Sequence, residues 1–225
     1  MGKILRVDLG TKKISQEIVS PEDESNFLGG MGVATAIFTR EVPASIDPYD
    51  AGNYLIFSVG PFCGTAMPFC GRHFVMGKSP LTQILGESSS GGHFGNELKR
   101  TGFDVVIVTG KSEKPVYLWI HDGKTEILDA SKFWGKGTQE ADAMIKNALG
   151  DEKIKVSTIG PAGEKLVKFA SIINDNHHIA GRCGLGAVMG SKKLKAIAVR
   201  GTGQILVKNK DALSEAAKKV RELLK

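Results

Sequence analysis

The sequence predicts an α+β fold built of mostly antiparallel or mixed β-sheets with a few helices. Segments with strand-like alternation outnumber segments with helical spacing. The strands follow one another in hairpins rather than alternating with helices as βαβ units would. A faint internal repeat favours a duplication with pseudo-two-fold symmetry. A chain of 225 residues with 41% hydrophobic residues can bury a sizeable core.

The first half begins with a hairpin and a capped helix. Residues 4–9 and 14–19 alternate in polarity around a turn at Gly10. Ser20 is predicted to cap a helix because Pro21 occupies its first position. Gly29 and Gly30 interrupt this helix before helical spacing resumes. The remaining elements expected here are strands at 54–61, 72–79 and 104–110 and a short helix at 96–101.

The second half is expected to contain a similar series of hairpins, strands and helices. A hairpin is expected over 115–128, with Asp122 and Gly123 at its turn, and a helix over 138–149. The next elements predicted are strands at 155–161, 167–173 and 195–201 and a helix at 187–194. The C-terminal residues 209–225 form an amphipathic helix with one apolar face made by Leu213, Ala216, Ala217, Val220, Leu223 and Leu224.

The internal repeat consists of short elements in the same order, at an offset of about 100 residues. A strand ending "VGP" at 59–61 precedes "GR" at Gly71–Arg72, a glycine-rich loop, a helix and a strand ending at Gly110. A strand ending "IGP" at 159–161 precedes "GR" at Gly181–Arg182, a glycine-rich loop, a helix and a strand ending at Gly201. The repeat predicts two similar loops, each with one arginine and bare backbone.

The formal net charge of +6 favours anionic partners, although a merely solvated basic surface remains equally open. No apolar run reaches the roughly 18 residues of a membrane span, and residues 1–7 do not resemble a signal peptide. We therefore expect a cytoplasmic protein that does not bind membranes.

The three cysteines are Cys63, Cys70 and Cys183, with no CxxC pair, so a disulfide framework is not expected. An iron–sulfur cluster needs about four thiolates, which this chain lacks. Zinc held by Cys63 and Cys70 with His73 or His93 is a weak alternative to buried free thiols.

Glycine accounts for 28 residues, about an eighth of the chain against a usual share of about 7%. The glycines cluster at 29–32, 91–95 and 181–190. One interpretation is tight turns that only glycine permits. The other is phosphate binding, by bare N–H groups at a helix N-terminus beside Arg182 and, in a second loop, Arg72.

Other phosphate and nucleic-acid motifs fit poorly. The chain lacks GxxxxGK[ST], and "GLGAVMG" does not directly follow a strand, as a Rossmann site requires. The basic run Lys192, Lys193 and Lys195 contains no aromatic residue, so no nucleic-acid partner is expected.

No residue is assigned a catalytic role. Histidines and carboxylates near the glycine loops are weak candidates: His93, His177, His178, Glu87, Asp104, Glu164 and Asp175. No serine lies in a nucleophile elbow. The chain has the features of a cofactor-binding domain without the reacting residues.

Four ordered segments resemble the N-terminal domain of tungsten-containing aldehyde:ferredoxin oxidoreductases. They begin at "GRHFVMGKSP", "SKFWGKGTQEA", "IGPAGEKLVKFASIIND" and "AGRCGLGAVMGSKKLKAIAVRG". The resemblance covers about residues 2–203 and implies a tungstopterin-binding domain over 1–203, with 204–225 starting a following helical domain. It implies a tungsten (or molybdenum) bis-pyranopterin cofactor whose two phosphates are bridged by magnesium.

The resemblance also implies site residues. Arg72 matches a pterin-binding arginine, and Gly91 and Gly92 match a glycine pair beside the cofactor. Magnesium is held largely by backbone carbonyls, which implies Ser89 and Ile179, although members often have asparagine before "SGG". His178 stands where members can have arginine, which puts one phosphate contact in doubt. The implied cofactor-binding set is Arg72, Ser89, Ser90, Gly91, Gly92, His178, Ile179, Ala180, Gly181, Arg182 and Gly184.

For the intact protein, the resemblance implies oxidation of aldehydes to carboxylic acids, with ferredoxin accepting the electrons. The acid/base residues and the cysteines of a [4Fe-4S] cluster would lie in the remaining C-terminal domains. A homodimer stays open. The alternatives are a related enzyme, such as an aromatic acyl-CoA reductase subunit, and a non-enzymatic phosphate- or nucleotide-binding module.

Overall fold

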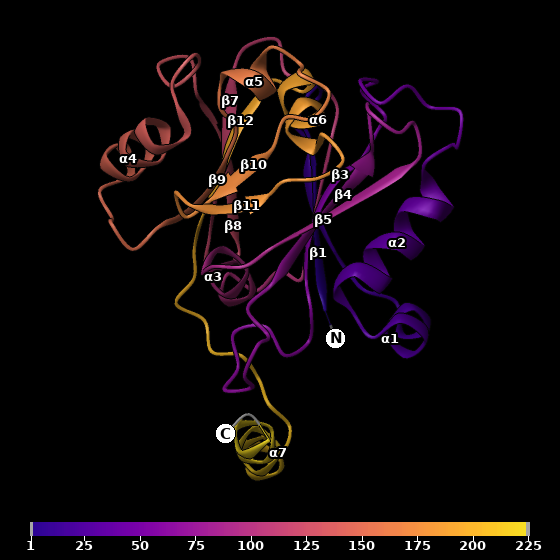
Figure 1. Ribbon diagram of the computed structural model, residues 1–225, viewed down its shortest axis with the longest axis vertical. Coiled ribbons are helices and arrows are strands. Elements are labelled where there is room, and N and C mark those ends of the chain that lie inside the picture. Colours follow the sequence, from indigo (N-terminus) through magenta and orange to yellow (C-terminus); the bar gives the residue numbers. More distant parts are fainter. Residues whose placement is uncertain (1, 224–225) are drawn as a thin grey trace.

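The computed structural model describes residues 2–223 and contains two six-stranded mixed sheets (Figure 1). The first sheet has the order β2-β1-β6-β3-β4-β5. Its strands are β1 (Lys3–Asp8), β2 (Ile14–Ile18), β3 (Leu55–Val59), β4 (His73–Lys78), β5 (Leu85–Ser90) and β6 (Val105–Thr109). The second has the order β11-β10-β9-β12-β7-β8. Its strands are β7 (Val116–His121), β8 (Lys124–Asp129), β9 (Lys155–Thr158), β10 (Ile172–Asn174), β11 (His178–Ala180) and β12 (Leu194–Arg200).

The sheet topology confirms the predicted duplication. Read from the other edge, the second sheet is β8-β7-β12-β9-β10-β11, so that each strand corresponds to the one six places earlier in the chain. The strand directions agree as well, since β1 and β6 are parallel, β7 and β12 are parallel, and the other pairs are antiparallel. The two halves therefore have the same fold and are related by a pseudo-two-fold axis.

Seven helices occur within residues 2–223. They are α1 (Pro21–Phe27), α2 (Gly30–Glu41), α3 (Phe94–Arg100), α4 (Thr138–Leu149), α5 (Pro161–Glu164), α6 (Leu185–Ser191) and α7 (Lys210–Glu222). The predicted cap is confirmed, because Ser20 Oγ accepts from Asp23 N at 3.0 Å. The bounds of α4 are those that its spacing predicts. No helix in the described part is long and apolar enough to cross a membrane.

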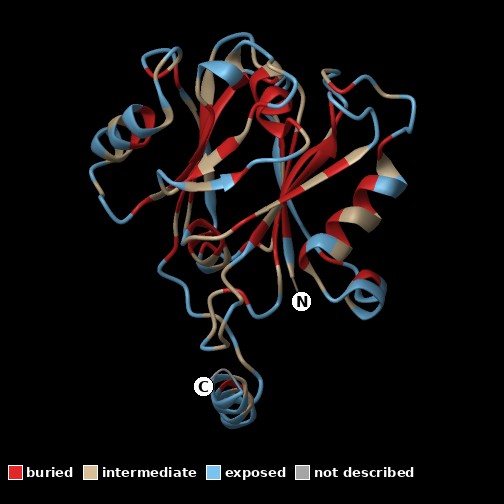
Figure 2. Cartoon of the chain, in the orientation of Figure 1, coloured by how far each residue is buried: buried red, intermediate tan, exposed pale blue. Residues whose placement is uncertain are grey.

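The core lies in three layers. The central layer fills the space between the two sheets, where α3 and α6 each contact strands of both sheets. α1 and α2 cover the outer face of the first sheet, and α4 covers the outer face of the second. Figure 2 shows buried strands flanked by helices that are exposed on their outer sides. The central strands β3 and β12 are buried on both faces and are mostly apolar without alternation.

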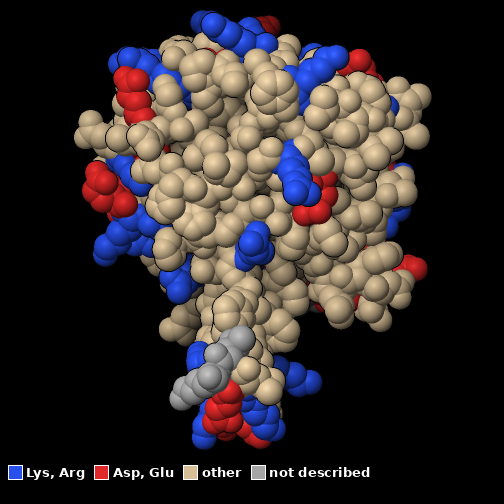
Figure 3. All heavy atoms as spheres, viewed as in Figure 1, with Lys and Arg blue, Asp and Glu red and all other residues tan. Residues whose placement is uncertain are grey.

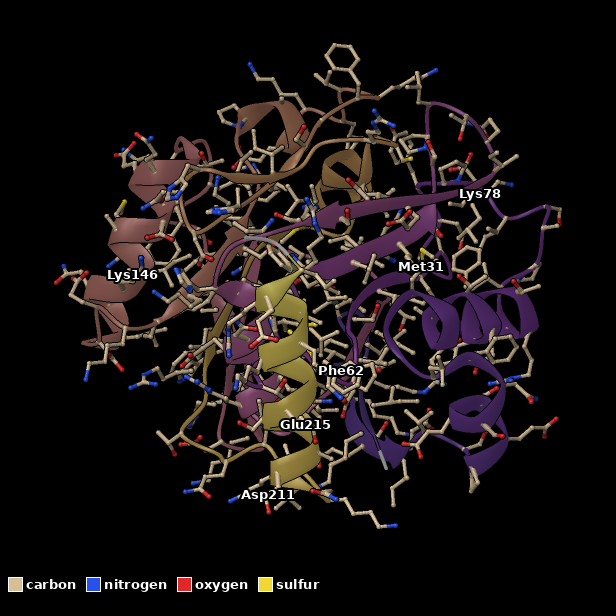
Figure 4. The ribbon with its side chains drawn as sticks, turned by 60° about the horizontal axis from the view of Figure 1, so that its bottom comes forward. Met31, Phe62, Lys78, Lys146, Asp211 and Glu215 are labelled. Carbon is tan, nitrogen blue, oxygen red and sulfur yellow. The ribbon has the colours of Figure 1, made fainter. Side chains whose placement is uncertain are left out.

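α7 lies apart from the two sheets, below them in Figure 1. Ala217 is buried, and Arg221 donates to the carbonyl of Ala66 at 2.9 Å. Figure 4, seen from this end, shows Phe62 beside α7, while Asp211 and Glu215 lie along the helix. Leu224, predicted on the apolar face, lies outside the described residues. The domain boundary at 203 stays a prediction.

Several sequence expectations are wrong in detail. Residues 88–90 and 178–180 were expected in loops but belong to β5 and β11, because they pair with β4 and β10. The predicted strand at 167–173 begins only at Ile172, and the helix predicted over 187–194 ends at Ser191, because Leu194 starts β12. The two "GR" dipeptides are not equivalent, because Gly71–Arg72 precede β4 whereas Gly181–Arg182 follow β11.

Candidate functional site

The candidate site lies where the edge strands of the two sheets meet. β5 and β11 are the terminal strands of their sheets, and they pack against each other at the front of Figure 1 without joining one sheet. Arg182 N donates to Ser88 Oγ at 3.1 Å across this contact. An edge strand leaves a row of backbone N–H and C=O groups without ladder partners. Two such edges therefore offer donors and acceptors to a ligand lying on the axis.

The strand registers identify equivalent residues in the two halves. His73 pairs with Ser90 in the first sheet, and Ile172 pairs with Ala180 in the second. Ser89 and Ile179 are consequently equivalent, and so are Gly91 and Gly181. Ser90 and Ala180 are buried, whereas Ile179 is 54% exposed. Figure 2 shows β11 in front of buried strands, and Ile179 is its exposed residue.

Each half places one guanidinium beside the glycine that follows its edge strand, Gly91 or Gly181, although from different positions. Arg72 continues the strand that pairs with β5, so it lies next to Gly91, and its Nη1 donates to Ser89 Oγ at 3.2 Å. Arg182 directly follows Gly181. Both arginines are exposed, and no carboxylate pairs with either within residues 2–223. Two unneutralised guanidinium groups on one face are suited to phosphate.

Most glycines of the 181–190 cluster are required by close contacts within the protein. A side chain at Gly184 would collide with the Lys168 carbonyl, and one at Gly190 would collide with the Gly163 carbonyl. A Cβ at Gly186 would lie 2.5 Å from the Ser171 carbonyl oxygen, which is also too close. Gly181 is different, because a Cβ there would meet only Ile179 and Ser171 side-chain atoms, at 3.2 and 3.8 Å. Tight packing against backbone thus explains the glycines at 184–190, whereas Gly181 has no such backbone neighbour.

The expected anion sites at helix N-termini are wrong. At α3, Asp175 Oδ2 already accepts from His93 N at 2.6 Å and from Phe94 N at 2.9 Å. At α6, Gly186 N donates to the Ala170 carbonyl at 3.0 Å, and the start of the helix is buried. Contacts within the protein therefore use several of the N–H groups that were expected to bind an anion.

A buried polar cluster lies beneath the first glycine pair. It contains His73, Asn174, Asp175 and His178, and each has at least one buried polar atom without a hydrogen-bond partner. His73 is fully buried, and this burial lowers the pKa of its imidazole to about 4. His73 is therefore neutral at neutral pH. The ring of His178 packs against Gly91 and Gly92 instead of extending from the face.

Two of the candidate carboxylates form ion pairs within the protein. Glu164 forms a buried ion pair with Lys195 at 2.5 Å, and Asp104 pairs with Lys99. Lys192 and Lys195 are fully buried and Lys193 is exposed, so most of the basic run 192–195 lies inside the protein. Figure 3 shows charged side chains mainly around the periphery and on α7, with a largely uncharged middle.

The cysteines are free thiols, and burial raises the pKa of Cys63 to about 11. No group of three or more His, Cys, Asp or Glu side chains in the described residues is placed to hold a metal. The large hollows lie elsewhere: a groove of about 920 Å³ along α1 and α2, and one of about 690 Å³ beneath α7.

The two halves of the duplicated fold thus bring their edge strands together on one face, where Arg72 and Arg182 are exposed. The chain belongs to the family of aldehyde ferredoxin oxidoreductase N-terminal domains, whose model matches residues 4–201. It is 48% identical over 209 residues to the tungsten-containing aldehyde ferredoxin oxidoreductase of Pyrococcus furiosus. It is 35% identical over 219 residues to the aliphatic sulfonate oxidoreductase, WOR-like subunit, of the same organism.

Among solved structures, it is similar to the active site complex BamBC of benzoyl coenzyme A reductase in complex with 1,5-dienoyl-CoA. The TM-score is 0.96 and the identity 39%, over 98% of this chain and 34% of that chain. The Pyrococcus furiosus aldehyde enzyme is matched over 93% of this chain and 34% of its own length. The chain thus spans about a third of the length of these relatives.

Proposed function

We propose that this domain is the base on which a tungsten or molybdenum bis-pyranopterin binds in a longer oxidoreductase. The observation that carries the proposal is the equivalence of Ser89 and Ile179 on two unpaired strand edges that meet at the pseudo-two-fold axis. A cofactor with two similar halves matches a face with two similar halves. The tungsten-containing relatives support this proposal.

The residues of this face fit such a cofactor. Arg72 and Arg182 would each neutralise one phosphate, because both guanidinium groups are exposed and lack carboxylate partners. The Gly91 and Gly181 backbone would lie against the cofactor, and the Ser89 and Ile179 carbonyls would hold the bridging magnesium. The chemistry that the cofactor supplies when bound is two-electron transfer at the metal.

The remaining residues implied by the resemblance contribute less directly. Ser90 and Ala180 are buried and can offer only backbone atoms, and Gly92 lies against Asp175 and His178. His178 packs on the glycine pair, so it does not replace a phosphate-binding arginine. Gly184 is buried against Lys168, and we place it outside the face.

For the whole protein, we propose oxidation of aldehydes to carboxylic acids in the cytoplasm, with ferredoxin as electron acceptor. The [4Fe-4S] cluster and the acid/base residues belong to the remaining domains, and this chain holds and orients the cofactor. The first experiment is tungsten and molybdenum analysis, by plasma mass spectrometry, of the protein purified from its native host. Near-stoichiometric tungsten supports the proposal, molybdenum changes only the metal, and the absence of both contradicts it.

A second candidate is an aromatic acyl-CoA reductase subunit, favoured by the similarity to the benzoyl coenzyme A reductase complex. The metal-loaded protein separates the two candidates. Reduction of ferredoxin by aldehydes supports the first, and reaction with an aromatic acyl-CoA or its dienoyl product supports the second. A nucleotide-binding module is disfavoured, because the N-termini of α3 and α6 are already occupied.

A further inference from the structure

The first glycine pair is held by a carboxylate from the other half of the molecule. Asp175 lies in the turn between β10 and β11, 82 residues from His93. Its Oδ2 accepts from both His93 N and Phe94 N, the groups that directly follow Gly91 and Gly92. One oxygen thereby fixes the backbone where β5 ends and α3 begins.

Gly92 shows how closely this carboxylate approaches the loop. Its φ is +87°, and a Cβ at Gly92 would lie 2.7 Å from Asp175 Oδ2 and 3.0 Å from His178 Cγ. Any side chain at this position would displace the carboxylate or the imidazole. The glycine is thus required by Asp175 and His178, and not by an outside ligand.

The second glycine loop is held in the reciprocal way. Ser88, on β5, is 5% exposed, and its Oγ accepts from Arg182 N at 3.1 Å. The hydroxyl comes from the first half and the amide from the second. A side chain of each half therefore holds the backbone beside Gly91 and Gly92 or beside Gly181 in the other half.

The turn that carries Asp175 is held at an energetic cost. Asp175 has a φ of +50° and Asn176 a φ of +67°, a left-handed conformation that Asp and Asn adopt more readily than other residues with a Cβ. The second oxygen of Asp175, Oδ1, is buried without a hydrogen-bond partner. Costs of this kind persist where the surrounding structure requires them and cluster at ligand-binding sites.

We propose that Asp175 and Ser88 are crossed positioning residues, which hold the two glycine loops at the separation the axial ligand requires. This inference rests on the proposed function, since the ligand is the bis-pyranopterin. Neither residue needs to touch it. Asp175 sets the first loop and with it the Ser89 carbonyl, and Ser88 sets the second loop and with it Arg182.

The test uses Asp175→Ala, Asp175→Asn and Ser88→Ala in the intact protein, with Asp122→Ala as the matched control. Asp122 is also a turn aspartate with positive φ, and it accepts from Thr202 N at 2.7 Å, but in the β7–β8 hairpin. The readouts are tungsten content, melting temperature, and hydrogen exchange by mass spectrometry of peptides covering 91–98 and 181–188.

For Asp175→Ala, exchange over 91–98 should rise roughly 2- to 30-fold, the equivalent of a lost helix cap. Tungsten content should fall further in Asp175→Ala than in Asp122→Ala, relative to the decrease in melting temperature of each variant. Asp175→Asn keeps an acceptor oxygen and should restore both readouts. Ser88→Ala should raise exchange over 181–188 and lower tungsten content.

Unchanged exchange in Asp175→Ala, or equal tungsten loss in Asp175→Ala and Asp122→Ala, overturns the inference. Failure of the proposed function gives a different pattern. If the proposed function is wrong, Arg72→Ala and Arg182→Ala should also have the same tungsten content as the wild type. The exchange readouts still decide whether Asp175 and Ser88 position the loops.

Discussion

Ser89 and Ile179 occupy the same position in the two halves of the fold, one on each edge strand at the pseudo-two-fold axis. Ser89 pairs with Phe74 on β4, and Ile179 pairs with Ile173 on β10. Each precedes a buried small residue and then a glycine, so backbone is presented similarly from both sides. The contribution of this face can be tested separately from the stability of the domain.

Replacement of Arg72 or Arg182 with alanine should weaken cofactor retention without unfolding the domain. Both guanidinium groups are exposed and unpaired with carboxylates, so their loss removes charge and little packing. The measurement is tungsten content together with the melting temperature. Arg100→Ala, at another exposed arginine, is the control. A full metal complement in both variants would show that the face does not bind the cofactor.

Gly91→Ala and Gly92→Ala should separate ligand binding from stability. A Cβ at Gly91 meets only His178 Cδ2, at an ordinary contact distance of 3.4 Å, so Gly91→Ala should fold normally and lose tungsten. Gly92→Ala should lower the free energy of unfolding by about 1–3 kcal/mol, because the φ of Gly92 is positive and the added Cβ would lie 2.7 Å from Asp175 Oδ2. Urea unfolding of both variants measures this difference, and equal stabilities would contradict it.

Lys192 should make the domain more stable as the pH rises from about 7 to about 10.5. Burial lowers the pKa of its ammonium to about 7 in the folded chain, while the unfolded value stays near 10.5. In that range the unfolded state binds more protons, so stability increases by up to about 1.4 kcal/mol per pH unit.

The measurement is the free energy of unfolding at pH 7 and 9 for wild type and Lys192→Met. The wild type should gain stability relative to the variant. The exposed neighbour Lys193, which donates to the Glu113 carbonyl at 2.7 Å, provides the control Lys193→Met. The same pH dependence in wild type and Lys192→Met would exclude Lys192 as its source.

His73 should make the stability of the domain depend on pH in the acidic range. Its pKa is about 4 in the folded chain and near 6.5 when unfolded, because burial disfavours the charged imidazole. Stability is therefore complete above pH 6.5 and is lost as the pH falls toward 4. His73→Gln should flatten this part of the profile. An NMR titration that places the His73 pKa above 6 would contradict the prediction.

The local elements were predictable because short-range chemistry specifies them. The Asp122–Gly123 turn, the Ser20 cap and the 138–149 helix each depend on residues within a few positions of one another. The order of elements also revealed the duplication. Ser88, Ser89 and Ser90 were not predicted as a strand, because a run of small polar residues has no hydrophobic alternation. Their pairing with β4 makes them a strand.

Sequence motifs were sufficient to identify the family, most of the helices and strands, and the two arginines that flank the candidate face. Only the tertiary structure decided that Asp175 caps α3, that Gly184 and Gly190 serve backbone packing, and that Lys192 is buried. Propensity and periodicity act over a few residues, whereas a contact such as Asp175 with Phe94 joins positions 81 apart. It exists only once two sheets have brought their edges together.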